Sequence, residues 1–387
     1  MGDLGLGARE KERGRTEVRP GIARVDASVE PDFDFLSAEY AALFEQSTAS
    51  AFQHPLWLAA LYEKLALPRS AQKVVVTVRD RGRLVAVLPL IQRTKTGFTL
   101  IESADLGVSD YAAPVVADDW IPGADLPMQI ASVLPAFDLM RIKPIREETV
   151  SKWQALLGGD VLPLDFQAHH ARLASTVDAW RAEALEPSFA KRLDKASKRF
   201  FKTPGATFAL LANEHEIGDA LRQLAALRAG RFDGDPIQQD FVRDFYEQVA
   251  ASGFRQNFTR IYALKVGDDP VGYLFGLTWK GRFHYLLVGC DYTRHGKYSP
   301  GLILCDSIIK DWIGAGGTIF DFTIGDEAYK RDFGVTSTLM FILKRAPTWR
   351  GKLASASFDA REQLRRMNWG RKPVATAAVK TGGGNEA

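Results

Sequence analysis

The chain has 387 residues, of which 46% are hydrophobic and 25% are charged; this is a globular composition, and the length exceeds that of one ordinary domain. The formal net charge of +3 gives no indication of a dedicated nucleic-acid-binding protein, so we expect no DNA partner and only local basic surfaces. The two cysteines, Cys290 and Cys305, cannot form a disulfide framework and suit a reducing compartment.

The chain begins with a polar, charged stretch over residues 1–21, which we expect to be a disordered tail. This stretch lacks the apolar core of a secretory signal, and no run of about 18 apolar residues occurs in the sequence. We therefore expect a cytoplasmic protein without a membrane-spanning helix. Residues 351–387 are expected to form a basic C-terminal helix and a second disordered tail.

Two stretches of similar organisation indicate two related halves. Residues 72–93 are typical of two strands joined by a tight polar turn, and residues 259–289 have the same pattern with a third strand added. A short segment containing Phe-Asp follows each of them, FDLMRI from residue 137 and FDFTIG from residue 320. We predict an α/β protein with a mixed α+β sheet in two tandem lobes, residues 22–170 and 171–350, each with helices flanking a central sheet.

The second half alternates helices and strands along the chain. Amphipathic helices are expected over residues 186–202, 218–232 and 240–253, followed by the three antiparallel strands. A helix over residues 299–317 can be capped by Ser299, with Pro300 in its first turn. It leads into a short strand at 318–323, a short helix at 326–333 and a last strand at 337–345.

A strand that leads through a helix into a neighbouring strand is usually a parallel crossover. We therefore expect the strands FHYLLVG (283–289) and TIFDFT (318–323) to be parallel neighbours. Parallel neighbours that part at one end leave main-chain groups unpaired, and an extended amide ligand can bind there.

The stretch YSPGLILCDSIIKDWIGAGGTIFDFTIGDEAYKRDFG carries three blocks in order: Ser-Pro-Gly at a helix start, Phe-Asp-Phe, and Gly-Asp-Glu-x-Tyr-Lys. These blocks and the order of elements resemble the GNAT acyltransferase fold, in particular its CelD/BioF2-like branch, which is related to FemAB-type transferases with two GNAT domains. AFQHPLWLAALY (51–62) and SDYAAPVV (109–116) resemble landmarks of that branch in the first half. The resemblance implies an acyl-CoA-dependent N-acyltransferase of the EC 2.3.1 class, with acyl-CoA as co-substrate, no permanently bound cofactor and no metal.

The start of the helix at 299–317 resembles the turn at which GNAT domains bind the pyrophosphate of coenzyme A. Free N–H groups and the helix dipole favour an anion at such a turn. The resemblance makes five residues candidates for this donor site: Arg294, Lys297, Ser299, Pro300 and Gly301. The family's Arg/Gln-x-x-Gly-x-Gly/Ala loop is not matched, and an ordinary capped helix with solvated charges is the alternative.

Two residues are candidates for proton transfer. Tyr329 lies in the segment where GNAT enzymes often place a tyrosine that protonates the departing thiolate. His284 lies in the three-strand segment and can accept a proton from the incoming amine. For both residues the alternative is a packed side chain that makes an ordinary hydrogen bond.

Asp321 lies in a strand that we expect to be buried, where a carboxylate needs a partner. Lys330 or Arg331 is the expected partner, and a structural ion pair that shapes the site is favoured over a direct catalytic role. Asp326 opens the next helix, where an acid suits the helix dipole, and it can also orient the acceptor amine. Asp321, Asp326 and Lys330 therefore complete the catalytic candidates.

Basic and aromatic side chains gather in the helix over residues 188–202 and again beyond residue 345. This mixture favours an anionic membrane surface or, as in FemAB-type enzymes, transfer RNA; a solvated helix face is the alternative. The resemblance includes bacterial ceramide synthases, and we favour a long-chain sphingoid-type base as the amine acceptor, reached by peripheral binding at the inner face of the membrane. The alternatives are a sugar acceptor in exopolysaccharide biosynthesis and a non-catalytic GNAT-fold binding protein.

Overall fold

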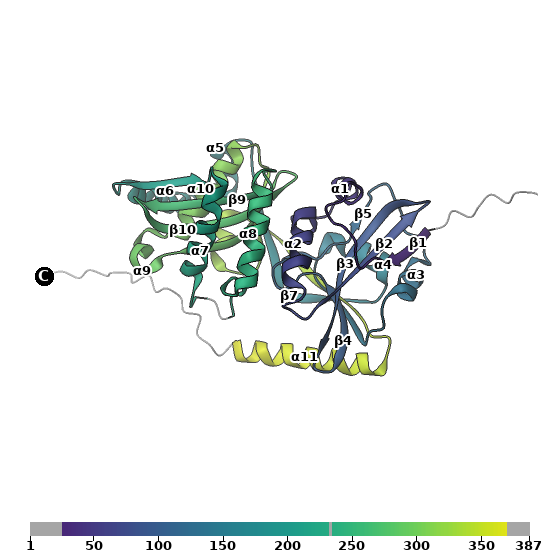
Figure 1. The fold of residues 1–387 in the computed structure, drawn as a ribbon. Helices are drawn as coiled ribbons and strands as arrows, with labels where there is room; N and C mark the ends of the chain where they lie inside the picture. Colours follow the sequence, from purple (N-terminus) through teal and green to yellow (C-terminus); the bar gives the residue numbers. More distant parts are fainter. Residues whose placement is uncertain (1–24, 232–233, 370–387) are drawn as a thin grey trace, which may run out of the picture.

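The computed structural model describes residues 25–231 and 234–369. The tails predicted before residue 22 and after the C-terminal helix lie outside the described residues. Within the described part, thirteen strands form one sheet, ordered β1-β2-β3-β4-β6-β13-β7-β12-β11-β10-β9-β8, with β5 paired to β3. Figure 1 shows the chain as two lobes that share this sheet, each with helices packed against it.

The first lobe is built from the following elements: β1 (Val25–Val29), α1 (Ala38–Glu45), η1 (Ala51–Gln53), α2 (Pro55–Leu65), β2 (Gln72–Asp80), β3 (Arg83–Lys95), β4 (Phe98–Ser103), β5 (Val115–Val116), α3 (Leu126–Val133), β6 (Leu139–Arg146), η2 (Glu147–Thr149) and α4 (Val150–Leu157). The predicted hairpin is confirmed, because β2 and β3 pair antiparallel around Asp80↔Arg83. Next in the sheet, β4 pairs antiparallel with β3 and parallel with β6.

The second lobe is built from the following elements: α5 (Val177–Ala184), α6 (Pro187–Phe201), β8 (Ala206–Leu210), η3 (Glu214–Glu216), α7 (Ile217–Arg228), η4 (Pro236–Gln238), α8 (Asp240–Phe254), β9 (Thr259–Val266), β10 (Asp269–Trp279), β11 (Arg282–Cys290), α9 (Tyr292–His295), η5 (Gly296–Tyr298), α10 (Pro300–Gly314), β12 (Ile319–Ile324) and η6 (Ala328–Phe333). The antiparallel meander β9-β10-β11 and the parallel pair β11–β12 are both confirmed. The segment predicted as a short helix is the 3₁₀ turn η6.

Two long strands join the lobes at the centre of the sheet. β7 (Asp160–Arg172) follows the first lobe in sequence, yet it pairs with β12 of the second. β13 (Thr336–Arg345) follows the second lobe, yet it pairs with β6 of the first. The two strands also pair with each other. Each lobe therefore gives a strand to its neighbour, and the predicted boundary between residues 170 and 171 falls inside β7.

The sheet is covered on both faces, as the amphipathic helices require. In the second lobe α5, α6 and α10 share one apolar cluster, and the predicted stripe residues Phe189, Leu193 and Phe200 of α6 are buried in it. On the opposite face α7 and α8 pack in a cluster that continues into α1 and α2 of the first lobe. Trp57 of α2 meets Phe245 of α8 with ring centroids 4.9 Å apart, so an apolar core also joins the lobes.

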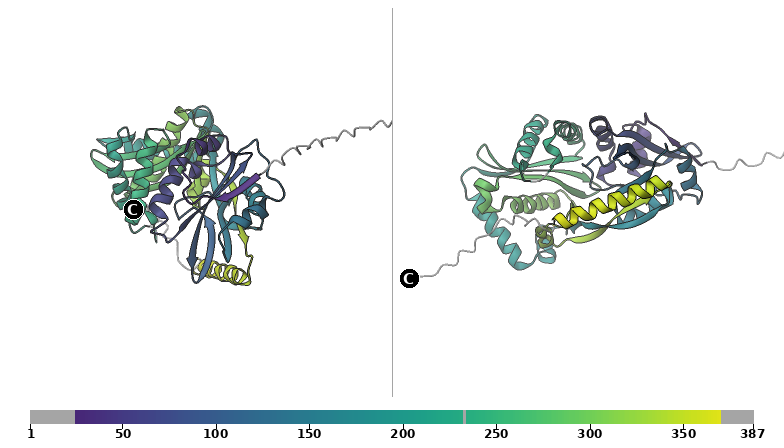
Figure 2. Two further views of the ribbon diagram at one scale, coloured as in Figure 1. Left: turned by 45° about the vertical axis from the view of Figure 1, so that its right-hand side comes forward. Right: turned by 90° about the horizontal axis from the view of Figure 1, so that it is seen from below.

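The C-terminal helix α11 (Trp349–Trp369) lies along one side of the molecule and packs on β4 and β6 (Figure 2). The helix predicted in this region is thus present. Ala354 of this helix is fully buried against Leu100 and Leu139, whereas Trp349 and Leu353 remain exposed. Among the described residues, no helix is both long and apolar enough to cross a membrane.

Candidate functional site

The parallel pair β11–β12 is short. The strands pair at Arg282↔Ile319, Phe283↔Phe320 and His284↔Asp321, and the parallel pairing ends there. In β11, Tyr285 and Leu287 face consecutive residues of β10, so Leu286 is the extra residue of a bulge. Thr323 of β12 has a φ of 56°, which is rare for a β-branched residue, and its hydroxyl donates to the Tyr285 carbonyl at 3.3 Å. The bulge and this turn of the backbone occur where the strands separate, as the sequence predicted.

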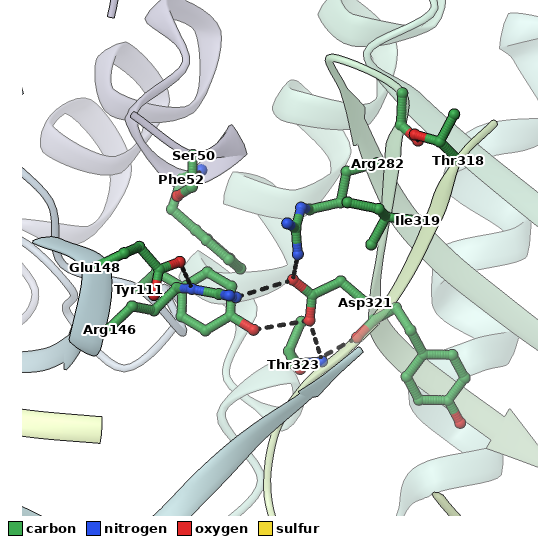
Figure 3. Close-up of polar contacts among 12 residues, drawn as sticks. Ser50, Phe52, Tyr111, Arg146, Glu148, Arg282, Thr318, Ile319, Asp321 and Thr323 are labelled. Atoms are coloured by element: carbon green, nitrogen blue, oxygen red, sulfur yellow. Dashed lines mark hydrogen bonds and ion pairs between the residues drawn. The ribbon is translucent and has the colours of Figure 1, made fainter. Parts of the chain in front are cut away.

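Asp321 lies at this point and is completely buried. The Tyr111 hydroxyl donates to Oδ1 at 2.8 Å, while Arg282 and Arg146 donate to Oδ2 at 2.8 and 3.3 Å (Figure 3). Tyr111 and Arg146 belong to the first lobe, so side chains from both lobes meet at one carboxylate. The expectation that Lys330 or Arg331 would pair with Asp321 was wrong.

These contacts decide the charge of Asp321. Burial alone would raise its pKa, but nearby positive charge and the hydrogen bond from Tyr111 lower the pKa to about 2. The two guanidinium groups supply that positive charge at neutral pH. Arg146 is held above its usual pKa by Tyr111 and Asp321, although its burial acts in the opposite direction. The cluster is therefore an ionised one at any physiological pH.

His284 is the cross-strand neighbour of Asp321 and is 1% exposed. Within the described part of the chain, neither of its ring nitrogens has a hydrogen-bond partner. Burial lowers the pKa of His284 to about 4; the Asp321 carboxylate opposes this shift, and the charges of Arg282 and Arg146 add to it. The imidazole is therefore neutral at pH 7, with both nitrogens uncommitted, which is unusual for a buried polar side chain.

A cavity of about 470 Å³ opens beside these residues. Its walls come from both lobes: Thr48, Ala49, Ser50, Tyr111, Ala112, Ala113, Arg146, Glu148, Thr149, Lys152, Trp279, Lys280, Arg282, His284, Ile319 and Asp321. Figure 3 shows Arg146 and Arg282 both directed at the Asp321 carboxylate, with Ser50 and Phe52 of the first lobe above Arg146 and Tyr111 in this view. A volume of this size between two lobes is typical of a small-molecule site.

Tyr329 points away from this cavity. It packs in the apolar cluster with α10, on the face of the sheet that carries Phe320 and Phe322. Its hydroxyl lies 3.5 Å from that of Tyr285, and burial raises its pKa far above the usual range, so it keeps its proton. Tyr329 and His284 therefore approach the separating strands from opposite faces of the sheet.

The residues predicted to bind the acyl-coenzyme A donor lie at the start of α10. Ser299 has a left-handed backbone and, in the described structure, its side chain makes no cap hydrogen bond, so the predicted cap was wrong; Pro300 does occupy the first turn. A Cβ on Gly301 would lie 2.5 Å from the Tyr292 hydroxyl, so a larger residue there would require the Tyr292 side chain to move.

The two cationic residues predicted to bind acyl-coenzyme A, Arg294 and Lys297, differ in their surroundings. Arg294 is held by two carboxylates, Asp291 and Asp269, the latter at 3.0 Å. Lys297 lies 5.0 Å from the centre of the Tyr298 ring, and Arg199 of α6 donates to the Lys297 carbonyl at 3.4 Å. The basic helix α6 thus reaches the turn that precedes α10.

The other two catalytic candidates, Lys330 and Asp326, make their contacts outside the cavity. Lys330 is 3% exposed and donates to the carbonyls of Ile324 and Gly325 at 2.8 and 3.0 Å, so it secures the turn after β12. Asp326 lies 2.9 Å from Nε2 of His169 on β7. Asp326 and Lys330 therefore do not line the cavity.

Sequence reasoning missed several residues of the site: Asp110, Tyr111, Arg146 and Arg282. The SDYAAPVV stretch was noted as a landmark, but nothing in the sequence linked Tyr111 to Asp321. Burial raises the pKa of Asp110, next to it, to about 6. Its carboxyl group therefore titrates close to neutral pH at the edge of the same site.

Neither a metal nor a reactive thiol is indicated among the described residues. They contain no group of three His, Cys, Asp or Glu side chains placed to hold a metal ion. Cys290 and Cys305 are both buried and free, and burial raises the pKa of Cys290 to about 12, so it is a thiol rather than a nucleophilic thiolate.

Comparison with known families agrees with this arrangement. Residues 187–331 match the family model described as "Acetyltransferase (GNAT) domain", which covers most of the second lobe. No curated protein matches the sequence.

Solved structures extend the likeness to both lobes. The structure of FemX superposes with a TM-score of 0.55 and 11% identity, covering 79% of this chain and 94% of that one. L-PGS from Bacillus licheniformis superposes with a TM-score of 0.52 and 14% identity, covering 83% of this chain and 94% of that one. The C-terminal domain of a putative lysylphosphatidylglycerol synthetase from Agrobacterium fabrum superposes with a TM-score of 0.51 and 15% identity, covering 82% of this chain and 92% of that one. At these identities the likeness shows the fold, and the predicted two-lobed, GNAT-like mixed α/β fold is confirmed.

Proposed function

We propose that this protein transfers an acyl group from acyl-coenzyme A to a primary amine at the point where β11 and β12 separate. The observation that carries the proposal is the neutral, buried His284, whose two ring nitrogens lack partners within the described structure and which lines the cavity between the lobes. The match of residues 187–331 to a GNAT acetyltransferase domain supports the type of reaction. The acceptor would lie in the cavity, and the donor would reach the separating strands from the side of α10.

The proposed reaction is a direct transfer. The amine nitrogen attacks the thioester carbonyl carbon, a C–N bond forms, and the C–S bond breaks. His284 takes one proton from the attacking nitrogen, and the Tyr329 hydroxyl gives one to the departing sulfur. Asp321 is a positioning residue, because it binds Arg146, Arg282 and Tyr111 beside the cavity.

The donor half of the proposal rests on the start of α10. Main-chain N–H groups at a helix N-terminus suit a pyrophosphate, and Lys297 lies in the turn that precedes them. Arg294 has its charge balanced by Asp269 and Asp291, so we assign the larger share of phosphate binding to Lys297.

The release of coenzyme A from acyl-coenzyme A, measured with and without an amine, tests the function. Tyr329→Phe should lower kcat by about 10²-fold while leaving donor affinity unchanged, since a thiolate leaves fairly well without an acid. Lys297→Ala should weaken donor binding by about 1.5–3 kcal/mol, the range for a hydrogen bond to a charged group. Arg294→Ala is the matched control and should have a smaller effect.

An amine-independent release of coenzyme A would contradict N-acylation. A Tyr329→Phe protein within twofold of wild type would make Tyr329 a packing residue. Calorimetry with equal coenzyme A affinity in wild type and Lys297→Ala would remove the start of α10 from the donor site.

For the acceptor, we retain a long-chain, sphingoid-type amine met at a membrane surface. The support is the exposed basic face of α6, which carries Lys191, Lys195, Lys198 and Lys202, with Phe201 41% exposed beside it. Each basic residue near an anionic leaflet contributes about 1 kcal/mol, so such a face can hold the protein reversibly.

Charge reversal of α6 tests this surface. Lys191, Lys195 and Lys198 changed to Glu should reduce binding to anionic vesicles and the acylation of vesicle-embedded amine at least about tenfold, and should spare a short soluble amine. Arg81→Glu, at the β2–β3 turn of the first lobe, is a control for a remote charge reversal. Equal losses on both amines would argue against surface docking. Turnover of a sugar, with long-chain amines inert, would favour the exopolysaccharide alternative.

A further inference from the structure

The cavity between the lobes has more positive than negative side chains in its walls. Its lining includes four cationic residues, Arg146, Lys152, Lys280 and Arg282, and two acidic ones, Glu148 and Asp321. Asp321 binds both arginines and Glu148 binds Arg146, so these four charges balance one another. The positive excess therefore lies with the two lysines.

The two lysines are neutralised only in part. Lys152 donates to the Thr48 hydroxyl and pairs with the carboxylate of Asp118, which is 3.4 Å away and does not line the cavity. Lys280 donates to the carbonyls of Glu45 and Ser47 at 2.7 and 2.8 Å, and these are uncharged acceptors. Lys280 is thus anchored between the β10–β11 turn and the end of α1 by uncharged acceptors, at the exposed rim of the cavity.

Two further groups in the walls have no partner in the described structure. One is His284, with both ring nitrogens, and the other is the indole N–H of Trp279, which immediately precedes Lys280. An indole N–H only donates, so it requires an acceptor atom from a ligand or from water. A donor next to an unbalanced ammonium group is an arrangement that fits the oxygens of an acid.

We propose that the amine acceptor carries an acidic group, a carboxylate or a phosphate, which binds at Lys280 and Trp279 while the amine meets His284. This inference rests on the proposed function, because it names the acceptor class of that same site. A plain ammonium ion entering a cavity with excess positive charge is repelled. An acid on the same molecule balances the lysine charge and fixes the orientation of the amine.

The test uses three pairs of acceptors that differ in the acid: serinamide and serine, glucosamine and glucosamine 6-phosphate, and sphinganine and sphinganine 1-phosphate. Coenzyme A release and product mass are measured with a long-chain acyl-coenzyme A. The acidic member of at least one pair should have a kcat/KM at least about tenfold higher than its partner. The pair that responds distinguishes a carboxylate from a phosphate and a lipid from a sugar.

Variants at the β10–β11 turn test whether Lys280 causes the preference for an acidic acceptor. Lys280→Met should raise KM for the acidic acceptor more than for its neutral partner, and Lys280→Arg, which keeps the charge, should retain the preference. Lys265→Met, on β9 and outside the cavity lining, is the matched control. Turnover that is equal within every pair, or faster for the neutral member, overturns this inference and leaves N-acylation standing. The absence of coenzyme A release with all six amines overturns both.

Discussion

Replacing Asp321 with asparagine is expected to lower the free energy of unfolding by about 3–5 kcal/mol, the cost of removing one partner from a buried ion pair. Asparagine keeps the shape of the side chain but not its charge. Arg146, whose side chain is 9% exposed, would then keep its positive charge beside the Tyr111 ring with only the more exposed Glu148 to balance it. The loss of stability arises because the Arg146 guanidinium group has lost its buried negative partner, and not because a hydrogen bond is missing.

Urea denaturation of the purified protein measures this loss. Asp332→Asn is the control, since Asp332 also pairs with an arginine, Arg192, but both side chains are well exposed and such pairs contribute about 0–1 kcal/mol. Adding Arg146→Met to Asp321→Asn should recover part of the stability, because it removes the stranded charge. A loss below about 1 kcal/mol in Asp321→Asn, with an unchanged denaturant slope, would contradict this account of the cluster.

Replacing His284 with glutamine is expected to lower kcat by about 10²–10⁴-fold, the usual contribution of a general base. Donor affinity should not change, because His284 lines the acceptor cavity rather than the start of α10. His215→Gln, on the exposed turn η3, is the control. Stopped assays with saturating acyl-coenzyme A give kcat, and calorimetry with coenzyme A gives the donor affinity.

The pH profile adds a second readout for His284. With a pKa of about 4, its imidazole becomes protonated only in acid, so the base is available throughout the neutral range and is lost as the pH falls toward 4. A wild-type profile that loses activity near pH 6 instead would fit Asp110, whose pKa burial raises to about 6. Such a profile, with a His284→Gln protein that retains activity, would move the base to Asp110.

Local patterns in the sequence predicted most of the second lobe. Alternating apolar residues gave the three antiparallel strands, and the Ser-Pro-Gly stretch gave the start of α10. The parallel pair β11–β12 followed from the order strand, helix, strand. These features depend on neighbours in the chain, so periodicity and turn residues are enough to find them.

The core of the site depends on contacts that no local pattern contains. Tyr111 and Arg146 are 210 and 175 residues away from Asp321 in the chain. Lys330 was expected to pair with Asp321 because it is close in sequence, but the chain turns at Gly325 and Lys330 bonds to the main chain there.

The repeated Phe-Asp pair was likewise an unreliable guide to equivalent positions. Asp138 precedes β6, whereas Asp321 is the last residue of β12 that pairs with β11. In the first lobe the last parallel pair is Glu102↔Arg141, so different side chains occupy the position of the His284–Asp321 pair. The similarity of the halves lies in strand order and not in this motif.

The exchange of β7 and β13 also bears on how the protein is made. During synthesis the sheet of the first lobe ends at β6 until residues 336–345 have left the ribosome, because β13 is the strand that pairs with that edge. A nascent chain would therefore carry an open strand edge through most of its elongation, and such edges invite pairing with other chains. Either lobe produced as a separate fragment would keep that open edge permanently. The sheet that joins the two halves is thus complete only after β13 has been made.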